Sequence, residues 1–215
     1  MKYKGLVFDF NGTLVWDTPY HNQAFDIFLE KHNIHLTDHE KTIKIHGKTN
    51  PDIMRGIFER GLSNDEIQAF STEKETIYQN LVINDLHFAD GAENLFNFLK
   101  QNKIPFCIAT SSDFFNVEFY FRQLNLQRWF SVEHVIYNDG TLKGKPEPDI
   151  FLRAAERMQL SPDELVIFED SKAGVLAAER AGAGKIYIVN SIDDDFSTHN
   201  HEIIYSFDQV NRSLF

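Results

Sequence analysis

The apolar residues of this chain form two kinds of pattern, and the first is a set of short runs separated by long intervals. Four of these runs are GLVFDF (5–10), PFCIAT (105–110), LVIFED (165–170) and KIYIVN (185–190), and a weaker fifth is EIIYSF (202–207). Because these runs are apolar throughout instead of alternating with polar residues, they are typical of strands buried on both faces of a parallel sheet.

The second pattern repeats apolar residues at the spacing of an α-helix and occupies the intervals between the runs. It predicts helices over 91–101, 114–124, 147–158 and 171–183. In the third of these, apolar residues recur from Ile150 to Met158, and Pro148 suits the first turn. Strands that alternate with helices predict an α/β fold with a doubly wound, Rossmann-like parallel sheet.

Residues 17–84 interrupt this alternation, because they hold three or four helical patterns and no convincing strand. The sequence SNDE, from Ser63 to Glu66, is a capping box that predicts the start of a long helix running through Tyr78 and Leu81. We therefore expect an all-helical cap over 17–85, inserted into an α/β core formed by 1–16 and 86–215. A chain of 215 residues is long enough for such a core with one insertion.

Composition narrows the class of protein further. A net charge of −11 without a dense basic segment argues against nucleic acid or an anionic membrane as a partner. No apolar segment approaches the roughly 18 residues that span a bilayer, and Asp9 interrupts the N-terminal apolar run before it reaches the length of a signal peptide.

Cys107 lies in an apolar run, which favours a buried thiol over a nucleophile. We expect a soluble cytoplasmic protein, either a monomer or a weak dimer. The aromatic segment 114–124 suits either the core or a dimer face, and we favour the core.

Polar side chains follow three of the four predicted strands, namely Asp9 after the first, Thr110, Ser111 and Ser112 after the second, and Glu169 and Asp170 after the third. At one strand end such residues commonly only form a turn, but three ends on one rim indicate a site, since ligands bind beyond the carboxyl ends of parallel strands. Carboxylates gathered there need a cation, and oxygen ligands suit Mg²⁺, which also accepts a phosphate oxygen. The sequence therefore predicts a magnesium–phosphate site.

Two further segments favour a bound phosphate. Gly12 and Thr13 allow a sharp turn, from which backbone N–H groups are expected to point at an anion beside Asp9. Lys145 precedes Pro146 and a helix start, a fixed place from which an ammonium group neutralises a phosphate. A lysine before proline is usually a solvated turn, but the neighbouring strand ends favour the functional interpretation.

Taken together, these residues resemble the haloacid dehalogenase superfamily of phosphohydrolases, in its helical-cap group that includes β-phosphoglucomutase. Four motifs occur in the family's order: DFNGTL, ATSS, KGKPEPDIF and FEDSKAG. A single motif of this length is weak evidence, whereas the ordered set, which extends over nearly the whole chain, is highly specific.

The resemblance implies that Asp9 attacks a phosphoryl group and forms an aspartyl-phosphate intermediate. It implies that Mg²⁺ is held by the Asp9 carboxylate, the Asn11 backbone carbonyl and Asp170, with Glu169 as a further or water-mediated ligand. Thr110 and Lys145 would then bind the oxygens of the transferred phosphoryl group, and catalysis would consist largely of positioning and charge neutralisation.

The resemblance also assigns the insertion to a cap that selects the substrate. The segment DTPYHNQAF suggests that His21 approaches the site, although a histidine on the surface or in the cap core fits equally well. The segment HGKTNPDI resembles a substrate-specificity loop, with Gly47, Lys48 and Asn50 as candidate substrate-binding residues, and Lys74 aligns with a cap lysine of the mutases. Asn50 stands where the mutases carry a phosphate-binding arginine, which weakens the mutase interpretation unless Lys48 substitutes.

Asn11 is the main departure from the family pattern, because phosphatases and mutases carry a second aspartate there as the general acid and base. An amide donates a hydrogen bond but cannot transfer a proton. The remaining explanations are a slow or specialised phosphatase, proton transfer by another group such as His21, a non-catalytic binder, and an engineered Asp-to-Asn change. We expect a Mg²⁺-dependent phosphohydrolase of a small phosphorylated metabolite, favouring a sugar phosphate; the alternatives are a β-phosphoglucomutase-type phosphoryl transfer and a pseudoenzyme that binds phosphometabolites.

Overall fold

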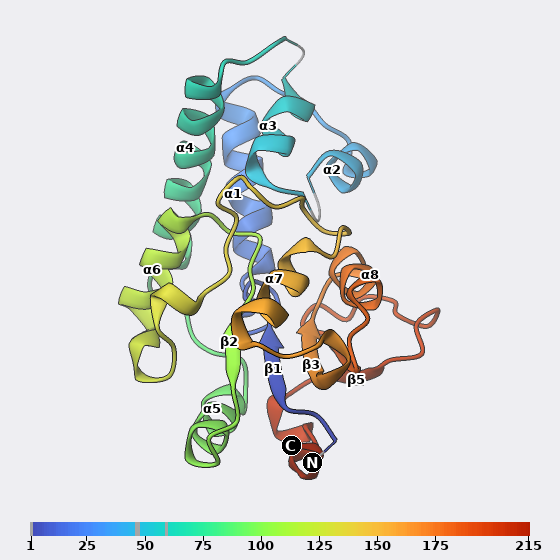
Figure 1. The fold of residues 1–215 in the computed structure, drawn as a ribbon. Helices are drawn as coiled ribbons and strands as arrows, with labels where there is room; N and C mark the ends of the chain where they lie inside the picture. Colours follow the sequence, from blue (N-terminus) through green and yellow to red (C-terminus); the bar gives the residue numbers. More distant parts are fainter. Residues whose placement is uncertain (1, 46–47, 59) are drawn as a thin grey trace. The chain divides into compact units, whose positions relative to one another are not determined.

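The computed structural model of the protein describes residues 2–45, 48–58 and 60–215 (Figure 1). The chain separates into two compact units, one formed by Met1–Trp16 and His87–Phe215 and the other by Asp17–Leu86. We call the first the α/β unit and the second the helical unit. The sequence places the second boundary one residue earlier, after residue 85.

The α/β unit is built on a parallel sheet with the strand order β2-β1-β3-β4-β5. Its strands are β1 (Gly5–Phe8), β2 (Phe106–Ile108), β3 (Leu165–Glu169), β4 (Lys185–Val189) and β5 (Glu202–Ile204). Every pair of neighbouring strands is parallel. The predicted doubly wound α/β core is therefore confirmed, and β1 lies between β2 and β3, so its carboxyl end is flanked by two others.

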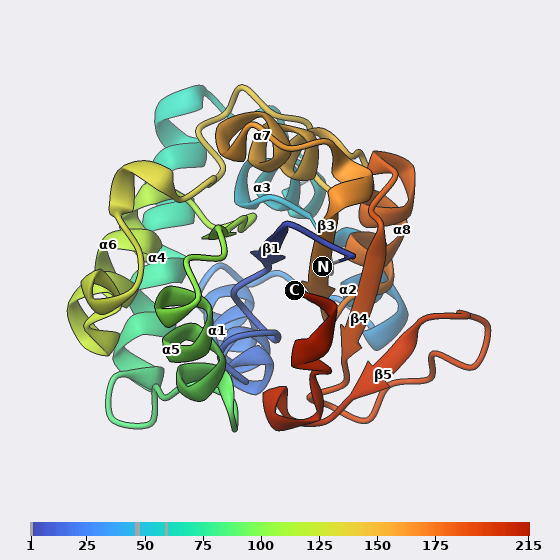
Figure 2. The same ribbon diagram turned by 60° about the horizontal axis from the view of Figure 1, so that its bottom comes forward.

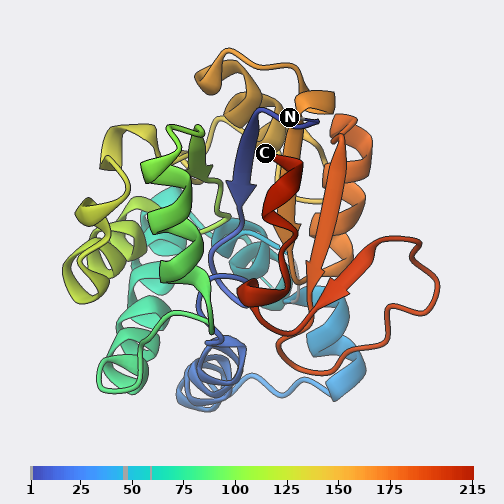
Figure 3. The same cartoon turned by 90° about the horizontal axis from the view of Figure 1, so that it is seen from below.

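Helices cover both faces of this sheet (Figure 2). They are α5 (Ala92–Gln101), α6 (Phe114–Leu124), α7 (Asp149–Met158) and α8 (Lys172–Ala181). Short 3₁₀ turns connect them, η1 (Leu126–Arg128), η2 (Val132–His134) and η3 (Pro162–Glu164), and two more, η4 (Phe207–Gln209) and η5 (Arg212–Leu214), form the C-terminal segment. In Figure 3, α5 and this C-terminal segment lie in front of the strands, and α7 and α8 lie behind them.

Alternate residues of the strands pack against these two helical layers. Val7 and Ile167 point to the face covered by α7 and α8, where they join a cluster that includes Phe151 and Ala178. Phe8 points to the other face, where its ring stacks on Phe168 at 4.8 Å and meets Phe207 edge-on at 5.9 Å. A sheet that is apolar on both faces is what the continuous apolar runs predict.

The strands stop one to three residues before the ends of the apolar runs that predicted them. At β1 the last sheet hydrogen bond is from the Asp9 N–H to the Phe168 carbonyl, at 3.0 Å, and a turn follows in which the Gly12 N–H donates to the Val15 carbonyl. The third predicted helix begins at Asp149 instead of residue 147, with Pro148 as its N-cap. Polar residues at the ends of the runs thus belong to turns and not to the sheet.

One extended segment was not predicted from the sequence. Ile136 forms a parallel bridge with Ala109, and its backbone exchanges hydrogen bonds with Ile108 and Thr110. The sheet is therefore extended beside β2 at the point where Thr110 leaves the strand.

The aromatic helix α6 is only partly a core helix. It buries Val117, Phe119 and Tyr120, whereas Phe114 and Phe115, in its first turn, are 42% and 40% exposed. The expectation that the segment belongs to the core holds for one face of the helix.

The helical unit contains α1 (Thr18–Lys31), α2 (Asp38–Lys44), α3 (Asn50–Ile57) and α4 (Asn64–Val82). The capping box at Ser63 and Glu66 is present and begins α4, as predicted. Helices α1 and α4 pack side by side, and α3 packs on α4 (Figure 1). A core of its own fills the unit, with Phe28 and Met54 fully buried. None of the described helices combines the length and the apolarity needed to cross a membrane.

Candidate active site

The three acids predicted at the strand ends lie together. Asp9 directly follows β1, Glu169 is the last residue of β3 and Asp170 follows it, and the two strands are paired in register. One carboxylate oxygen from each lies within 4.8 Å of the others. Asp9 and Glu169 are buried, so this is a concentration of negative charge that a cation must offset.

Lys145 supplies one such cation. Its Nζ lies 2.5 Å from Asp9 Oδ1 and also donates to Glu169 Oε1, and its side chain is only 6% exposed. Burial by itself lowers the pKa of Lys145, but the charges of Asp9 and Glu169 outweigh it, so the pKa lies above the ordinary lysine value. Lys145 is therefore a permanently charged group in contact with the candidate nucleophile.

Glu169 is held rigidly from its other side. Its Oε2 accepts hydrogen bonds from the N–H groups of Asp170 and Ser171 and from the Ser171 hydroxyl. Gly174 in α8 makes room for this carboxylate, since a Cβ built there would lie 2.0 Å from the Glu169 carboxyl carbon. The Glu169 side chain is thus fixed by the start of α8.

The glycine turn after β1 positions Asp170. Gly12 has a φ of +77°, and a Cβ there would lie 1.9 Å from Asp170 Oδ2, while the Thr13 hydroxyl donates to Asp170 Oδ1 at 3.3 Å. The Gly12 and Thr13 N–H groups donate to the carbonyls of Val15 and Phe10. The Gly12 and Thr13 N–H groups therefore bond within the turn, and the expectation that backbone N–H groups of this turn point at an anion stays a prediction.

The end of β2 contributes hydroxyl groups to the same rim. Thr110 is 1% exposed, and its Oγ1 accepts a hydrogen bond from the Ser112 N–H at 3.1 Å. Ser111, between them, is partly buried. The following loop therefore orients the Thr110 hydroxyl, whose proton is not used in the hydrogen bond with the Ser112 N–H.

The Asn11 side chain is bound at both ends of its amide. The Ser112 hydroxyl donates to Asn11 Oδ1 at 2.8 Å, and Asn11 Nδ2 donates to the Tyr120 hydroxyl at 2.7 Å. Tyr120, in α6, was not among the residues predicted from the sequence. A lone tyrosine in a phenylalanine-rich helix was the available signal.

In the helical unit, three of the predicted substrate-binding residues form one network. Lys74 Nζ contacts His21 Nδ1 at 2.8 Å and Glu75 Oε1 at 3.0 Å, and Asn50 Nδ2 donates to the same Glu75 oxygen at 2.6 Å. Lys74 and Glu75 are buried, at 2% and 3% exposure. Glu75, the centre of this network, was not predicted from the sequence.

His21 is further ordered by aromatic and acidic neighbours. Its ring stacks on Tyr78 with a centroid separation of 3.8 Å, and its Nε2 lies 3.5 Å from Asp17 Oδ2. Lys48 is exposed and takes no part in this network, and Gly47 lies outside the described residues.

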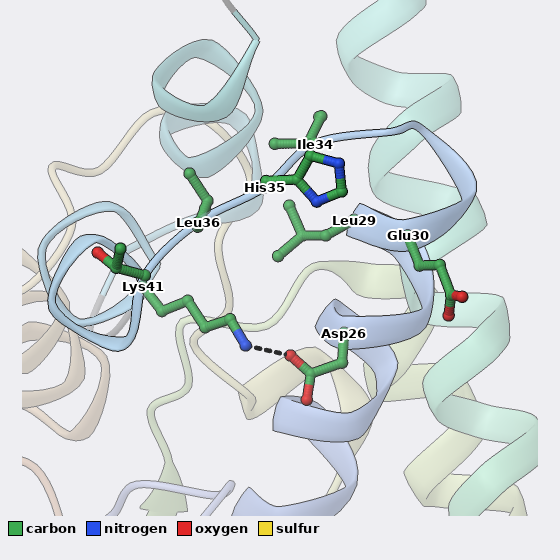
Figure 4. A pocket seen from close by; sticks show the side chains of 8 residues that line it. Asp26, Leu29, Glu30, Ile34, His35, Leu36 and Lys41 are labelled. Carbon is green, nitrogen blue, oxygen red and sulfur yellow. Dashed lines mark hydrogen bonds and ion pairs between the residues drawn. The ribbon is translucent and has the colours of Figure 1, made fainter.

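The helical unit also carries a groove of about 570 Å³, lined by Asp26, Leu29, Glu30, Ile34, His35, Leu36, Thr37 and Lys41. Figure 4 shows Lys41 reaching across it to Asp26, at 2.6 Å. The described site residues are not among those that line it, and we assign it no function.

Comparison with known proteins points to one family. The sequence profile of the haloacid dehalogenase-like hydrolases matches residues 3–182. Hexitol phosphatase A of Escherichia coli K12 is 30% identical over 210 residues, which cover 98% of this chain and 94% of that protein. The β-phosphoglucomutase of Bacillus subtilis 168 is 30% identical over 187 residues, covering 83% and 80%.

A solved structure agrees with these relatives. The crystal structure of a HAD hydrolase of family IA, variant 3, from Entamoeba histolytica superimposes with a TM-score of 0.86 at 32% identity and covers 98% of this chain and 96% of that one.

Proposed function

The chain belongs to the haloacid dehalogenase-like hydrolase family, and from that premise we propose that it is a Mg²⁺-dependent phosphatase of a small phosphorylated metabolite, with sugar phosphates as the favoured substrates. The observation that carries the proposal is the contact of Asp9 with Lys145 beside Glu169 and Asp170. A buried carboxylate at a strand end, paired with a charged lysine, is equipped to attack a phosphoryl group whose negative charge the lysine offsets.

The proposed reaction has two steps at Asp9. Its carboxylate oxygen attacks phosphorus, the bond from phosphorus to the ester oxygen breaks, and the alcohol leaves with a proton from solvent or a nearby acid. Water then attacks the aspartyl-phosphate, which releases phosphate and restores the carboxylate. Lys145 stabilises the charge on the phosphoryl oxygens, and Thr110 and Ser111 lie at the neighbouring strand end as candidate ligands of those oxygens.

The acidic residues fit a magnesium ion. Asp9, Glu169 and Asp170 supply only oxygen donors within 4.8 Å of one another, which is the ligand chemistry that Mg²⁺ prefers, and we propose that the Asn11 carbonyl completes this set. When bound, the ion would withdraw charge from the phosphoryl oxygens. Gly12 and Thr13 serve this site by holding Asp170.

We propose that Asn11 makes this phosphatase slow. General acid–base catalysis is worth about 10²–10⁴-fold, or roughly 3 to 5 kcal/mol of barrier, and a carboxamide does not provide it. Esters with good leaving groups should therefore be hydrolysed fastest.

We assign substrate selection to the helical unit, through His21, Gly47, Lys48, Asn50 and Lys74. The network in which Glu75 joins Lys74 to Asn50, and Lys74 contacts His21, supports this assignment. This network also favours hydrolysis over phosphoglucomutase-type transfer. Binding a second phosphate needs a positive charge, and the Glu75 carboxylate, which binds both Lys74 and Asn50, offsets the charge of Lys74.

A screen of phosphate esters with Mg²⁺, run on the native chain, Asn11→Asp and Asp9→Ala, tests the proposal. We expect slow release of phosphate by the native chain, a rise of at least about 10²-fold in kcat for Asn11→Asp, and none for Asp9→Ala. Unchanged turnover in Asp9→Ala would reject the assignment of the nucleophile.

Two other outcomes would support the alternatives. Release by Asn11→Asp but not by the native chain would make the natural protein a phosphometabolite binder. A reaction that starts only when a sugar bisphosphate is added would identify a mutase.

A further inference from the structure

The hydrogen bonds around Asn11 form a small cradle made from two hydroxyl groups of the α/β unit. Ser112 Oγ donates to Asn11 Oδ1 at 2.8 Å, and Asn11 Nδ2 donates to the Tyr120 oxygen at 2.7 Å. An amide has one accepting and one donating end, and each end is matched by a hydroxyl group in the required role. Movement of the side chain away from these two hydroxyl groups would break both hydrogen bonds.

The Tyr120 hydroxyl is held in place by the packing of its ring. Tyr120 and Phe10 are each 1% exposed, and their rings stack with a centroid separation of 4.3 Å and an angle of 24°. Phe10 lies between Asp9 and Asn11 in the sequence. The segment that carries the candidate nucleophile is therefore fixed to α6 through the same tyrosine that binds the amide.

A hydroxyl at this position is not needed to fill the core. The other aromatic residues of α6 are Phe114, Phe115, Phe119 and Phe121. A buried hydroxyl group costs free energy unless it is hydrogen-bonded, so a phenylalanine would pack at position 120 without that cost. Asn11 is a partner that offsets this cost.

The second hydroxyl group of the cradle connects position 11 to the neighbouring strand end. The Ser112 N–H donates to Thr110 Oγ1 at 3.1 Å, while its own hydroxyl donates to Asn11. Thr110 and the position-11 side chain are therefore oriented by one residue.

From this geometry we propose that Tyr120 is a positioning residue, which together with Ser112 sets the direction of the position-11 side chain during phosphoryl transfer. The inference rests on the proposed function for the reaction itself. Tyr120 contacts Asn11 and acts through it.

The test compares Tyr120→Phe with Tyr187→Phe, which removes a hydroxyl group from another fully buried tyrosine of the same unit. We expect Tyr120→Phe to lower kcat about 3- to 10-fold, the equivalent of one neutral hydrogen bond, with KM unchanged within about twofold. Tyr187→Phe should leave both constants at native values. In an Asn11→Ala background the effect of Tyr120→Phe on kcat should disappear, because its target is gone. An equal loss in both backgrounds would overturn the proposal.

A readout that needs no turnover separates this inference from the proposed function. The side-chain amide NMR signals of Asn11, identified by their loss in Asn11→Ala, should move in Tyr120→Phe and stay in place in Tyr187→Phe. If no ester is hydrolysed but the signals move, the proposed function fails and the cradle stands. If the signals do not move, the cradle is wrong whatever the enzyme hydrolyses.

Discussion

Lys145 carries the charge balance of the strand-end site. Its ammonium group contacts two buried carboxylates, Asp9 and Glu169, and the oxygens of a third, Asp170, lie close by. Taking a carboxylate out of water costs several kcal/mol, and a buried carboxylate that loses its partner bears that cost uncompensated. Removing the lysine would therefore leave two buried carboxylates without the cation that they contact.

Lys145→Met should lower the free energy of unfolding by about 3 to 5 kcal/mol, because it removes the cation shared by two buried carboxylates. Urea denaturation without added metal measures this, with the exposed Lys143→Met as the control, which should stay within about 0.5 kcal/mol of the native value. Added Mg²⁺ should restore more stability to Lys145→Met than to the native chain. A loss of less than about 1 kcal/mol would show that the carboxylates do not depend on Lys145.

At the scale of the elements, helix α8 makes room for the Glu169 carboxylate at the expense of its own helix propensity. Glycine is a poor helix former, costing about 1 kcal/mol relative to alanine, yet Gly174 lies in the first turn of α8. The reason is space, since the Glu169 carboxylate occupies the position that a side chain at 174 would need.

Gly174→Ala should therefore destabilise the protein by roughly 1 to 3 kcal/mol, despite the better helix propensity of alanine. Gly56→Ala in α3 is the matched control, because no atom lies within 4 Å of a Cβ at that position, and it should be neutral or stabilising by up to about 1 kcal/mol. Urea denaturation of both variants decides the matter. Equal gains in stability would mean that Glu169 moves aside freely.

The sequence predicts elements better than the contacts between them. The apolar runs 5–10, 105–110 and 165–170 and the capping box at Ser63 were sufficient for the parallel sheet and for α4, because burial and capping are local signals. Tyr120 was missed because its contact with Asn11 joins positions 109 residues apart.

The helical unit shows the same limit. Glu75 sits beside Lys74 in the sequence, where nothing singles it out, whereas the fold buries both and brings Asn50 to the same carboxylate oxygen. Likewise, only the three-dimensional turn reveals that the Gly12 and Thr13 N–H groups donate to the carbonyls of Val15 and Phe10.

At the scale of the whole molecule, the α/β unit is closed by the two ends of the chain. The Lys2 and Tyr3 N–H groups donate to the Leu214 carbonyl, and Phe207 packs under Phe8 and Phe168 on the sheet. The residues after 182, which lie beyond the family profile, thus contribute two strands and part of the cover of one sheet face.

Cys107 reports on the integrity of this unit from the opposite face of the sheet. It is 3% exposed, and burial raises the pKa of its thiol to about 12, so almost no thiolate exists near pH 8 in the folded state. A thiol reagent should modify it only when the sheet opens, at a rate set by the population of the open state.

Phe207→Ala should destabilise the unit by about 3 to 5 kcal/mol, because it removes a fully buried ring that contacts two strands. The open population, and with it the labelling rate of Cys107, should rise at least about 100-fold, since each 1.4 kcal/mol is a tenfold change. Phe114→Ala is the control, because Phe114 is 42% exposed, and it should change the rate no more than about threefold. If Cys107 is labelled at the native rate in Phe207→Ala, a local opening that leaves the C-terminal cover in place exposes the thiol. If the C-terminal segment holds the sheet closed, Cys107 must be labelled at least about 100-fold faster in Phe207→Ala than in the native chain.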